Sequence, residues 1–249
     1  MISVIMNIRT TLSLVFVVII TLLLSAAAIG QIKPIVFVNA MIIDGSGGAA
    51  FRGNVRIKNG KIDKIGDFKP SKNDETVDAA GLVLAPGFID IHNHSESGLV
   101  SEGTAANQVS QGLTTVLVGP DGGSPFPITE YLAKLDGKIA VNVGAFIGHA
   151  TVREQVMKAD YLRKVTDDEI RQMAELVKQS MDDGAFGLSS GLEYDVGFSA
   201  TTEELIALAK AAAKHHGIYM THMRDEEEGM VDALREAIRI GREAKLPVQ

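Results

Sequence analysis

The alternation of strand-like and helix-like segments is the feature that most restricts the fold of this 249-residue chain. Beyond residue 81, short apolar runs rich in β-branched residues alternate with longer segments typical of helices. This alternation predicts an α/β protein with a parallel sheet covered by helices. The predicted strands are 88–94, 114–118, 139–146, 186–188, 218–221 and 246–249, and the predicted helices are 105–111, 128–135, 167–182, 201–216 and 230–245.

Two of these helices have recognisable ends. Thr166 precedes an acidic first turn and is the expected N-cap of helix 167–182, which Gly184 ends. Thr202 is the expected cap of helix 201–216, with Glu204 in its acidic first turn.

Polar residues gather just after several predicted strands, which bears on the choice between an open doubly wound sheet and a (β/α)8 barrel. No glycine-rich phosphate loop follows the first strand, and a barrel brings all its strand ends to one mouth. We therefore predict a TIM-like (β/α)8 barrel. A barrel needs on the order of 250 residues, whereas about 165 follow residue 81. The expectation is an incomplete barrel of about five to six strands, the front part of a longer protein.

The N-terminal third has a different pattern. Residues 1–30 combine an uncharged apolar run with small residues at 28 and 30, which predicts a signal peptide and an exported, periplasmic or secreted protein. The alternative is an uncleaved membrane anchor over residues 10–30, because the run is long enough to span a bilayer. Residues 31–80 read as a small antiparallel β module, with Asn59-Gly60 as a hairpin turn. Residues 81–249 are assigned to the barrel.

Composition excludes several classes of function. The net charge of −7 argues against nucleic acid as the main partner. The absence of cysteine excludes disulfides, thiolate metal ligands and a cysteine nucleophile. Ser189 and Ser190 lie in GLSSG, which does not match the GxSxG nucleophile pattern, so a serine hydrolase is disfavoured.

The segment LVLAPGFIDIHNHS, residues 82–95, contains the strongest chemical signal. It reads as an apolar strand, a Pro-Gly turn and a second strand that ends in His92 and His94. Side chains two residues apart on a strand share a face, so these imidazoles are expected to converge, with Asp90 deeper on the same face. Two such histidines form half of a metal site. The alternative is a pair of surface histidines on a turn.

Other polar residues complete the predicted site. Asp121, among glycines in VGPDGGS, is a candidate metal ligand or an ordinary turn aspartate, and His222 is a candidate ligand or a structural histidine. Arg224 is expected to bind a substrate carboxylate or to form a salt bridge. Tyr194 is expected to bind substrate or to cap its loop. His149 is expected to contact substrate or to support the metal ligands.

Several motifs together resemble the amidohydrolase superfamily. APGFIDIHNH after a β module is similar to its opening, and QGLTTVLVG, FIGHATVR, DGAFGLSSGLEY and YMTHMRDE resemble the D-aminoacylase branch, the N-acyl-D-amino-acid deacylases. The match covers nearly all of residues 35–249. The resemblance implies a (β/α)8 barrel with a small β-sandwich built from both chain ends. It also implies a zinc-dependent deacylase with one or two ions, and other divalent metals remain possible.

The resemblance also implies roles for individual residues. His92, His94 and His222 match metal ligands, Tyr194 matches a residue near the substrate carboxylate, and Asp121 stands where this branch usually has cysteine. A carboxylate in that place shifts metal preference away from soft ions. VGFSA after Tyr194 departs from the branch's usual loop. A further histidine and the general-base aspartate of the branch lie beyond the end of this sequence, so no catalytic proton acceptor is assigned.

The expected reaction is cleavage of the amide bond of an N-acyl-D-amino acid by hydroxide formed on the metal. Two alternatives stay open. The same site would serve another amidohydrolase that acts on a cyclic amide or a D-residue dipeptide. A third hypothesis is an inactive fragment or a non-catalytic binding domain.

Overall fold

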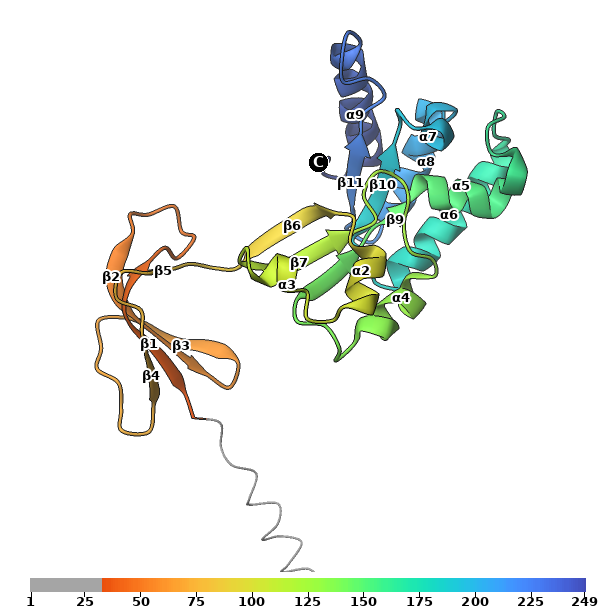
Figure 1. Cartoon of the computed structure of the whole chain (residues 1–249). Coiled ribbons are helices and arrows are strands. Elements are labelled where there is room, and N and C mark those ends of the chain that lie inside the picture. Colours follow the sequence, from red (N-terminus) through yellow and green to blue (C-terminus); the bar gives the residue numbers. More distant parts are fainter. Residues whose placement is uncertain (1–32) are drawn as a thin grey trace, which may run out of the picture. The chain divides into compact units, whose positions relative to one another are not determined.

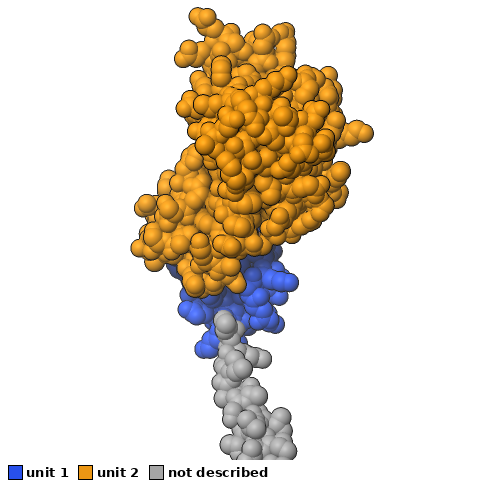
Figure 2. Space-filling view, turned by 90° about the vertical axis from the view of Figure 1, so that its right-hand side faces the viewer, with its two compact units in different colours: residues 1–86 blue, residues 87–249 orange. Residues whose placement is uncertain are grey.

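A computed structural model describes residues 33–249, and the chain divides into two compact units between Pro86 and Gly87 (Figure 2). The predicted export segment, residues 1–30, lies outside the described residues. Within residues 33–249, no helix has both the length and the apolar character needed to cross a membrane.

The first unit is a five-stranded sheet with β1 (Ile35–Ile42) at its centre (Figure 1). β1 pairs antiparallel with β2 (Phe51–Lys58), and β2 pairs antiparallel with β3 (Lys61–Gly66). Asn59 and Gly60 both have positive φ, 51° and 71°, so the predicted hairpin turn is confirmed. A small apolar core forms beneath this sheet from Ala40, Ile42, Val55 and Ala79.

Two features of the first unit differ from the prediction. β4 (Glu75–Asp78) and β5 (Val83–Leu84) pair parallel with β1, so the sheet is mixed and not purely antiparallel. Strands β1 to β5 of this unit form a single sheet. The pairing of β5 with β1 keeps residues 83–84 in this unit, whereas the sequence placed the start of the barrel at residue 81.

The second unit is an α/β domain in which every strand pairing is parallel. β6 (Phe88–Asn93), β7 (Leu113–Val118) and β8 (Asn142–Ala145) form one sheet, and β9 (Ile147–Gly148), β10 (Gly187–Gly191) and β11 (Ile218–His222) form another. Only Phe146 separates β8 from β9, and its N–H donates to the Val118 carbonyl. A parallel bridge from Tyr219 to Val248 adds the predicted last strand as a single pair. The described residues do not close a barrel.

Helices connect these strands in chain order (Figure 1). They are α2 (Glu96–Ser101), α3 (Ala106–Val109), α4 (Ile128–Leu135), α5 (His149–Met157), α6 (Asp167–Asp182), α7 (Asp195–Phe198), α8 (Thr202–Ala213) and α9 (Met230–Ala244), with a 3₁₀ turn at Lys158–Asp160. α4 and α6 have the predicted bounds. Thr166 and Glu169 form a reciprocal capping box at α6, whereas the cap of α8 is Thr201 and not the predicted Thr202.

The main core lies between the strands and these helices. Alternate strand residues such as Val116 and Val118 belong to the same buried cluster as Met173 of α6 and Leu205 of α8. Leu117, between Val116 and Val118, points to the opposite face of β7 and belongs to a second apolar cluster with Phe146 and Met220. The candidate site lies at the carboxyl ends of these strands, beyond the two apolar clusters.

Candidate metal centre

The end of β6 orients the two histidines. Asn93 is buried, and its side chain donates to Asp90 Oδ2 (2.8 Å) and accepts from the Ser95 N–H (3.0 Å). His92 and His94, on either side of Asn93, are therefore turned outward, with 49% and 61% of their side chains exposed. Asp90 also accepts from the His92 N–H (3.1 Å), so it fixes the strand end and lies outside the group of converging ligands.

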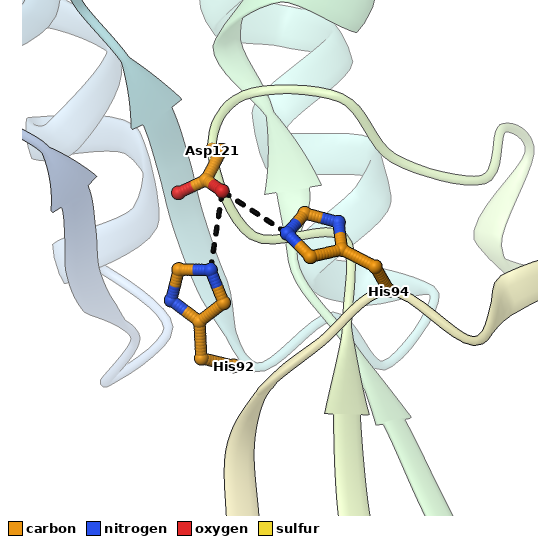
Figure 3. A group of neighbouring side chains, drawn as sticks. All are labelled: His92, His94 and Asp121. Atoms are coloured by element: carbon orange, nitrogen blue, oxygen red, sulfur yellow. Dashed lines mark hydrogen bonds and ion pairs between the residues drawn. The ribbon is translucent and has the colours of Figure 1, made fainter.

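Asp121 comes to the same place from the turn after β7. Its Oδ2 lies 3.1 Å from the Nε2 atom of His92 and 3.1 Å from that of His94 (Figure 3). The turn has left-handed backbone at Gly119, Asp121 and Gly122, with φ of 76°, 58° and 85°. Glycine adopts this conformation freely and aspartate tolerates it better than most residues, which explains why this sequence forms so tight a turn.

The three side chains fit a metal ion by the identity and spacing of their donor atoms. One ligand atom from each of His92, His94 and Asp121 lies within 4.8 Å of the other two. Ligand atoms bound at about 2.0–2.1 Å to a tetrahedral zinc ion are roughly 3.3 Å apart. This is close to the 3.1 Å between Asp121 Oδ2 and the Nε2 atom of each histidine. Imidazole nitrogen and carboxylate oxygen are both ordinary zinc ligands.

The surroundings of Asp121 also suit a cation. Its Oδ1 atom is buried and has no hydrogen-bond partner in the described structure. Among residues 33–249, its ion-pair partners are the two histidines, and no lysine or arginine pairs with it. A buried carboxylate oxygen without a partner is costly, and a bound cation would remove that cost.

His222, the fourth predicted ligand, lies in a neighbouring group at the end of β11. Its Nε2 atom is 2.7 Å from Glu193 Oε2, and its Nδ1 atom is 3.2 Å from the Tyr194 hydroxyl. Glu226 Oε1 is 3.9 Å from the same Nε2. The structure thus brings together three of the four predicted ligands and places His222 beside Glu193, a residue that the sequence analysis did not single out.

Tyr194 lies between the two groups. Partial burial raises the pKa of its hydroxyl, and the negative charges of Asp121, Glu193 and Glu226 raise it further. The absence of a side chain at Gly191 leaves room for both the Asp121 carbonyl and the Tyr194 ring. Tyr194 is half-exposed, so its neutral hydroxyl is available as a donor next to the histidine cluster.

Arg224 is placed where it serves the fold. Its guanidinium donates twice to Glu236, at 2.8 and 2.9 Å, and to the carbonyls of Phe198 and Ala200, at 3.0 and 3.1 Å. Of the two roles expected for Arg224, the structure shows the salt bridge, with Glu236 as its partner. These hydrogen bonds use four of the five N–H donors of Arg224, so no pair of donors is left for a bidentate bond to a substrate carboxylate.

His149 lies in the interior. Its side chain is fully buried, and its Nε2 atom is 2.9 Å from Glu204 Oε1. Arg153 donates to both oxygens of Glu204, at 2.5 and 2.6 Å. Burial raises the pKa of Glu204, but the hydrogen bonds and positive charge of His149 and Arg153 outweigh it and leave the pKa below its ordinary value. His149 therefore belongs to a buried ionic cluster and not to the exposed ligand group.

Most of this chain matches known proteins in sequence. The family described as the amidohydrolase family matches residues 75–249. A D-aminoacylase of Alcaligenes xylosoxydans xylosoxydans is 38% identical over 231 residues, which cover 83% of this chain and 48% of that protein. The chain thus spans about half the length of the curated relatives that it matches.

The chain is also similar to solved structures of related enzymes. An N-acyl-D-glutamate deacylase of Bordetella bronchiseptica, complexed with zinc and a phosphonate inhibitor, is 30% identical with a TM-score of 0.81, over 87% of this chain and 50% of that one. A D-aminoacylase studied for its binuclear metal centre is 33% identical with a TM-score of 0.80, over 87% and 51% of the two chains.

Proposed function

The chain belongs to the amidohydrolase family, and from this premise we propose that it is a metal-dependent hydrolase of the amide bond of N-acyl-D-amino acids. The observation that carries the proposal is the convergence of His92, His94 and Asp121 on one point. The similarity to D-aminoacylase and to a zinc-containing N-acyl-D-glutamate deacylase supports the substrate class.

The second unit is proposed to be part of a (β/α)8 barrel. Its support is the parallel pairing of successive strands, from β6 to β8 and from β9 to β11, with helices in the connections. His92 and His94 lie at the end of β6, Asp121 follows β7 and His222 ends β11. These are carboxyl ends of strands, where barrel enzymes carry their active sites.

Within this site, His92, His94 and Asp121 would hold one zinc ion, and His222 would serve a neighbouring position. When bound, zinc supplies a Lewis acid that polarises a carbonyl group and lowers the pKa of water towards neutrality. The Tyr194 hydroxyl, kept protonated by its raised pKa, is proposed to donate a hydrogen bond to the substrate carboxylate. Arg224 has no part in this scheme, because Glu236 and two carbonyls leave it no pair of donors for a carboxylate.

Metal content of the 249-residue chain and turnover of the full-length gene product test the proposal. After dialysis against zinc and then metal-free buffer, we expect about one zinc ion per chain, held by two imidazoles and a carboxylate. His94→Ala should lose this ion. His215→Ala is the matched control, because His215 also lies beside a carboxylate, 3.3 Å from Asp182, but in a different part of the unit.

Turnover of the full-length gene product is then assayed on N-acetyl-D-amino acids, their L enantiomers, a cyclic amide such as dihydroorotate and D-residue dipeptides. We expect hydrolysis of the D series, its loss after exhaustive chelation and its return with zinc. Undiminished hydrolysis after chelation would contradict metal dependence. A preference for the cyclic amide or the dipeptides would contradict the proposed substrate class.

A further inference from the structure

We propose that Ser189 is a positioning residue for this metal site, because its buried hydroxyl ties together the two ends of the turn that carries Asp121. The inference rests on the proposed function. It concerns the GLSSG segment, whose serines have no role in the proposed hydrolysis.

The contacts of Ser189 define this role. Ser189 lies on β10 and is fully buried. Its Oγ donates to the Gly119 carbonyl at 2.6 Å and accepts from the Gly122 N–H at 3.3 Å. Gly119 and Gly122 flank Asp121, and a hydroxyl is able to donate and accept at once. A single side chain from a distant strand therefore bridges the turn.

The turn needs such support, because the Asp121 carboxylate has few contacts of its own. Its Oδ2 meets only the two histidines that would be ligands, and its buried Oδ1 has no partner among the described residues. The position of the carboxylate is thus set by the backbone of the turn. That backbone is rich in glycine and adopts left-handed conformations, which the surrounding structure must hold in place.

Packing brings the turn and β10 close enough for this bridge to form. A side chain added at Gly122 would crowd the backbone of Ser190 and Gly191, and one added at Gly191 would collide with the Asp121 carbonyl. The turn therefore lies directly on β10. Glu96 Oε1 adds one tie from α2 by accepting from the Gly119 N–H at 2.9 Å.

The next residue provides a matched control. Ser190 is equally buried on the same strand, but its Oγ lies 2.6 Å from the Tyr219 hydroxyl and 2.8 Å from the Thr221 hydroxyl. Ser190→Ala therefore removes a buried hydroxyl with two hydrogen bonds and leaves the Asp121 turn untouched. The two alanine variants separate a general loss of stability from an effect on the metal site.

The experiment compares the unmodified 249-residue chain with Ser189→Ala, Ser189→Thr and Ser190→Ala. Zinc affinity is measured by competition with a chromophoric chelator, and the visible spectrum of the Co²⁺-loaded protein reports ligand geometry. Thermal unfolding in chelator gives the stability without metal. All samples contain sucrose, which favours the folded state.

We expect Ser189→Ala to bind zinc about tenfold more weakly and to alter the cobalt spectrum, as changes to residues that orient ligands do. Ser189→Thr keeps the hydroxyl and should bind more tightly than Ser189→Ala. Ser190→Ala should change zinc affinity by less than about twofold, although its unfolding temperature falls.

Two results would overturn the proposal: zinc affinity in folded Ser189→Ala equal to that of the unmodified chain, or equal losses in Ser189→Ala and Ser190→Ala. If Ser189→Ala does not fold, Ser189→Thr decides: an affinity and cobalt spectrum like those of the unmodified chain support the bridge, and a tenfold loss in a folded protein overturns it. A failure of the unmodified chain to bind zinc contradicts the proposed function itself.

Discussion

His149 and His92 each lie within about 3 Å of a carboxylate, at 2.9 and 3.1 Å, yet these carboxylates differ in everything else around them. Glu204, beside His149, has no exposure and is neutralised by Arg153. Asp121, beside His92, has no arginine or lysine partner among residues 33–249, and its histidines are half-exposed.

The difference shows what makes a pair of histidine and carboxylate suitable for a metal. In the buried cluster a permanent cation already balances the carboxylate, so a metal ion would add charge to a site that is neutralised. In the exposed cluster, Oδ1 of Asp121 has no hydrogen-bond partner among the described residues, and the two imidazoles converge on the other carboxylate oxygen, Oδ2. Proximity of a histidine and a carboxylate is therefore insufficient to make a metal site. What decides is whether an arginine or lysine already balances the carboxylate charge.

Arg153→Met tests the buried side of the comparison and should have the largest effect. It leaves the Glu204 charge buried without its arginine partner and removes hydrogen bonds to the carbonyls of Tyr161 and Arg163. We expect a loss of about 3–5 kcal/mol in the free energy of unfolding, measured with urea.

Two further variants control the Arg153 experiment. Arg171→Met removes an exposed pair with Asp168 and should cost no more than about 1 kcal/mol. Adding Glu204→Gln to Arg153→Met removes the stranded charge and should restore part of the stability. If Arg153→Met cost as little as Arg171→Met, the buried cluster would not have the structural role assigned to it.

Asp121→Asn tests the exposed side. Without metal, the variant should differ from the unmodified chain by less than about 1 kcal/mol, since the lost oxygen has no protein donor. With zinc at 100 times its dissociation constant, the unmodified chain should gain about 2.7 kcal/mol of stability and Asp121→Asn almost none.

Unfolding in urea with and without zinc measures both quantities. Asp182→Asn is the control, because Asp182 also pairs with a histidine, His215, but has Lys178 as a cation beside it. The same zinc-dependent gain in Asp121→Asn and in the unmodified chain would place the ion elsewhere.

The sequence predicted those parts of the structure that local chemistry determines. α4 and α6 have their predicted bounds, because apolar spacing and the Thr166 capping box act within one helix. The hairpin follows from Asn59-Gly60, because asparagine and glycine both tolerate the positive φ that this turn requires. His92, His94 and Asp121 were all named as candidate ligands, since residues at successive strand ends of an α/β sheet lie close together.

The sequence did not predict contacts between residues far apart in the chain. Glu204 reads as an ordinary first-turn acid of α8, but its partners Arg153 and His149 are 51 and 55 residues away. A salt bridge was one of two roles expected for Arg224, but its partner, Glu236 of α9, was not predicted. In both cases the identity of the partner depends on how helices pack, and no local pattern carries that information.

His222 and Glu193 form a third pair of this kind, and it should respond least to mutation. Glu193 is half-exposed, and no arginine or lysine pairs with it among the described residues, so water screens most of its interaction with His222. Glu193→Gln keeps the shape of the side chain and removes its charge. We expect the urea midpoint to change by the equivalent of about 0.5 kcal/mol or less, as for exposed Glu228→Gln. A loss above about 2 kcal/mol would mean that this pair behaves like the buried cluster, and exposure would then not separate structural histidines from those available to a metal.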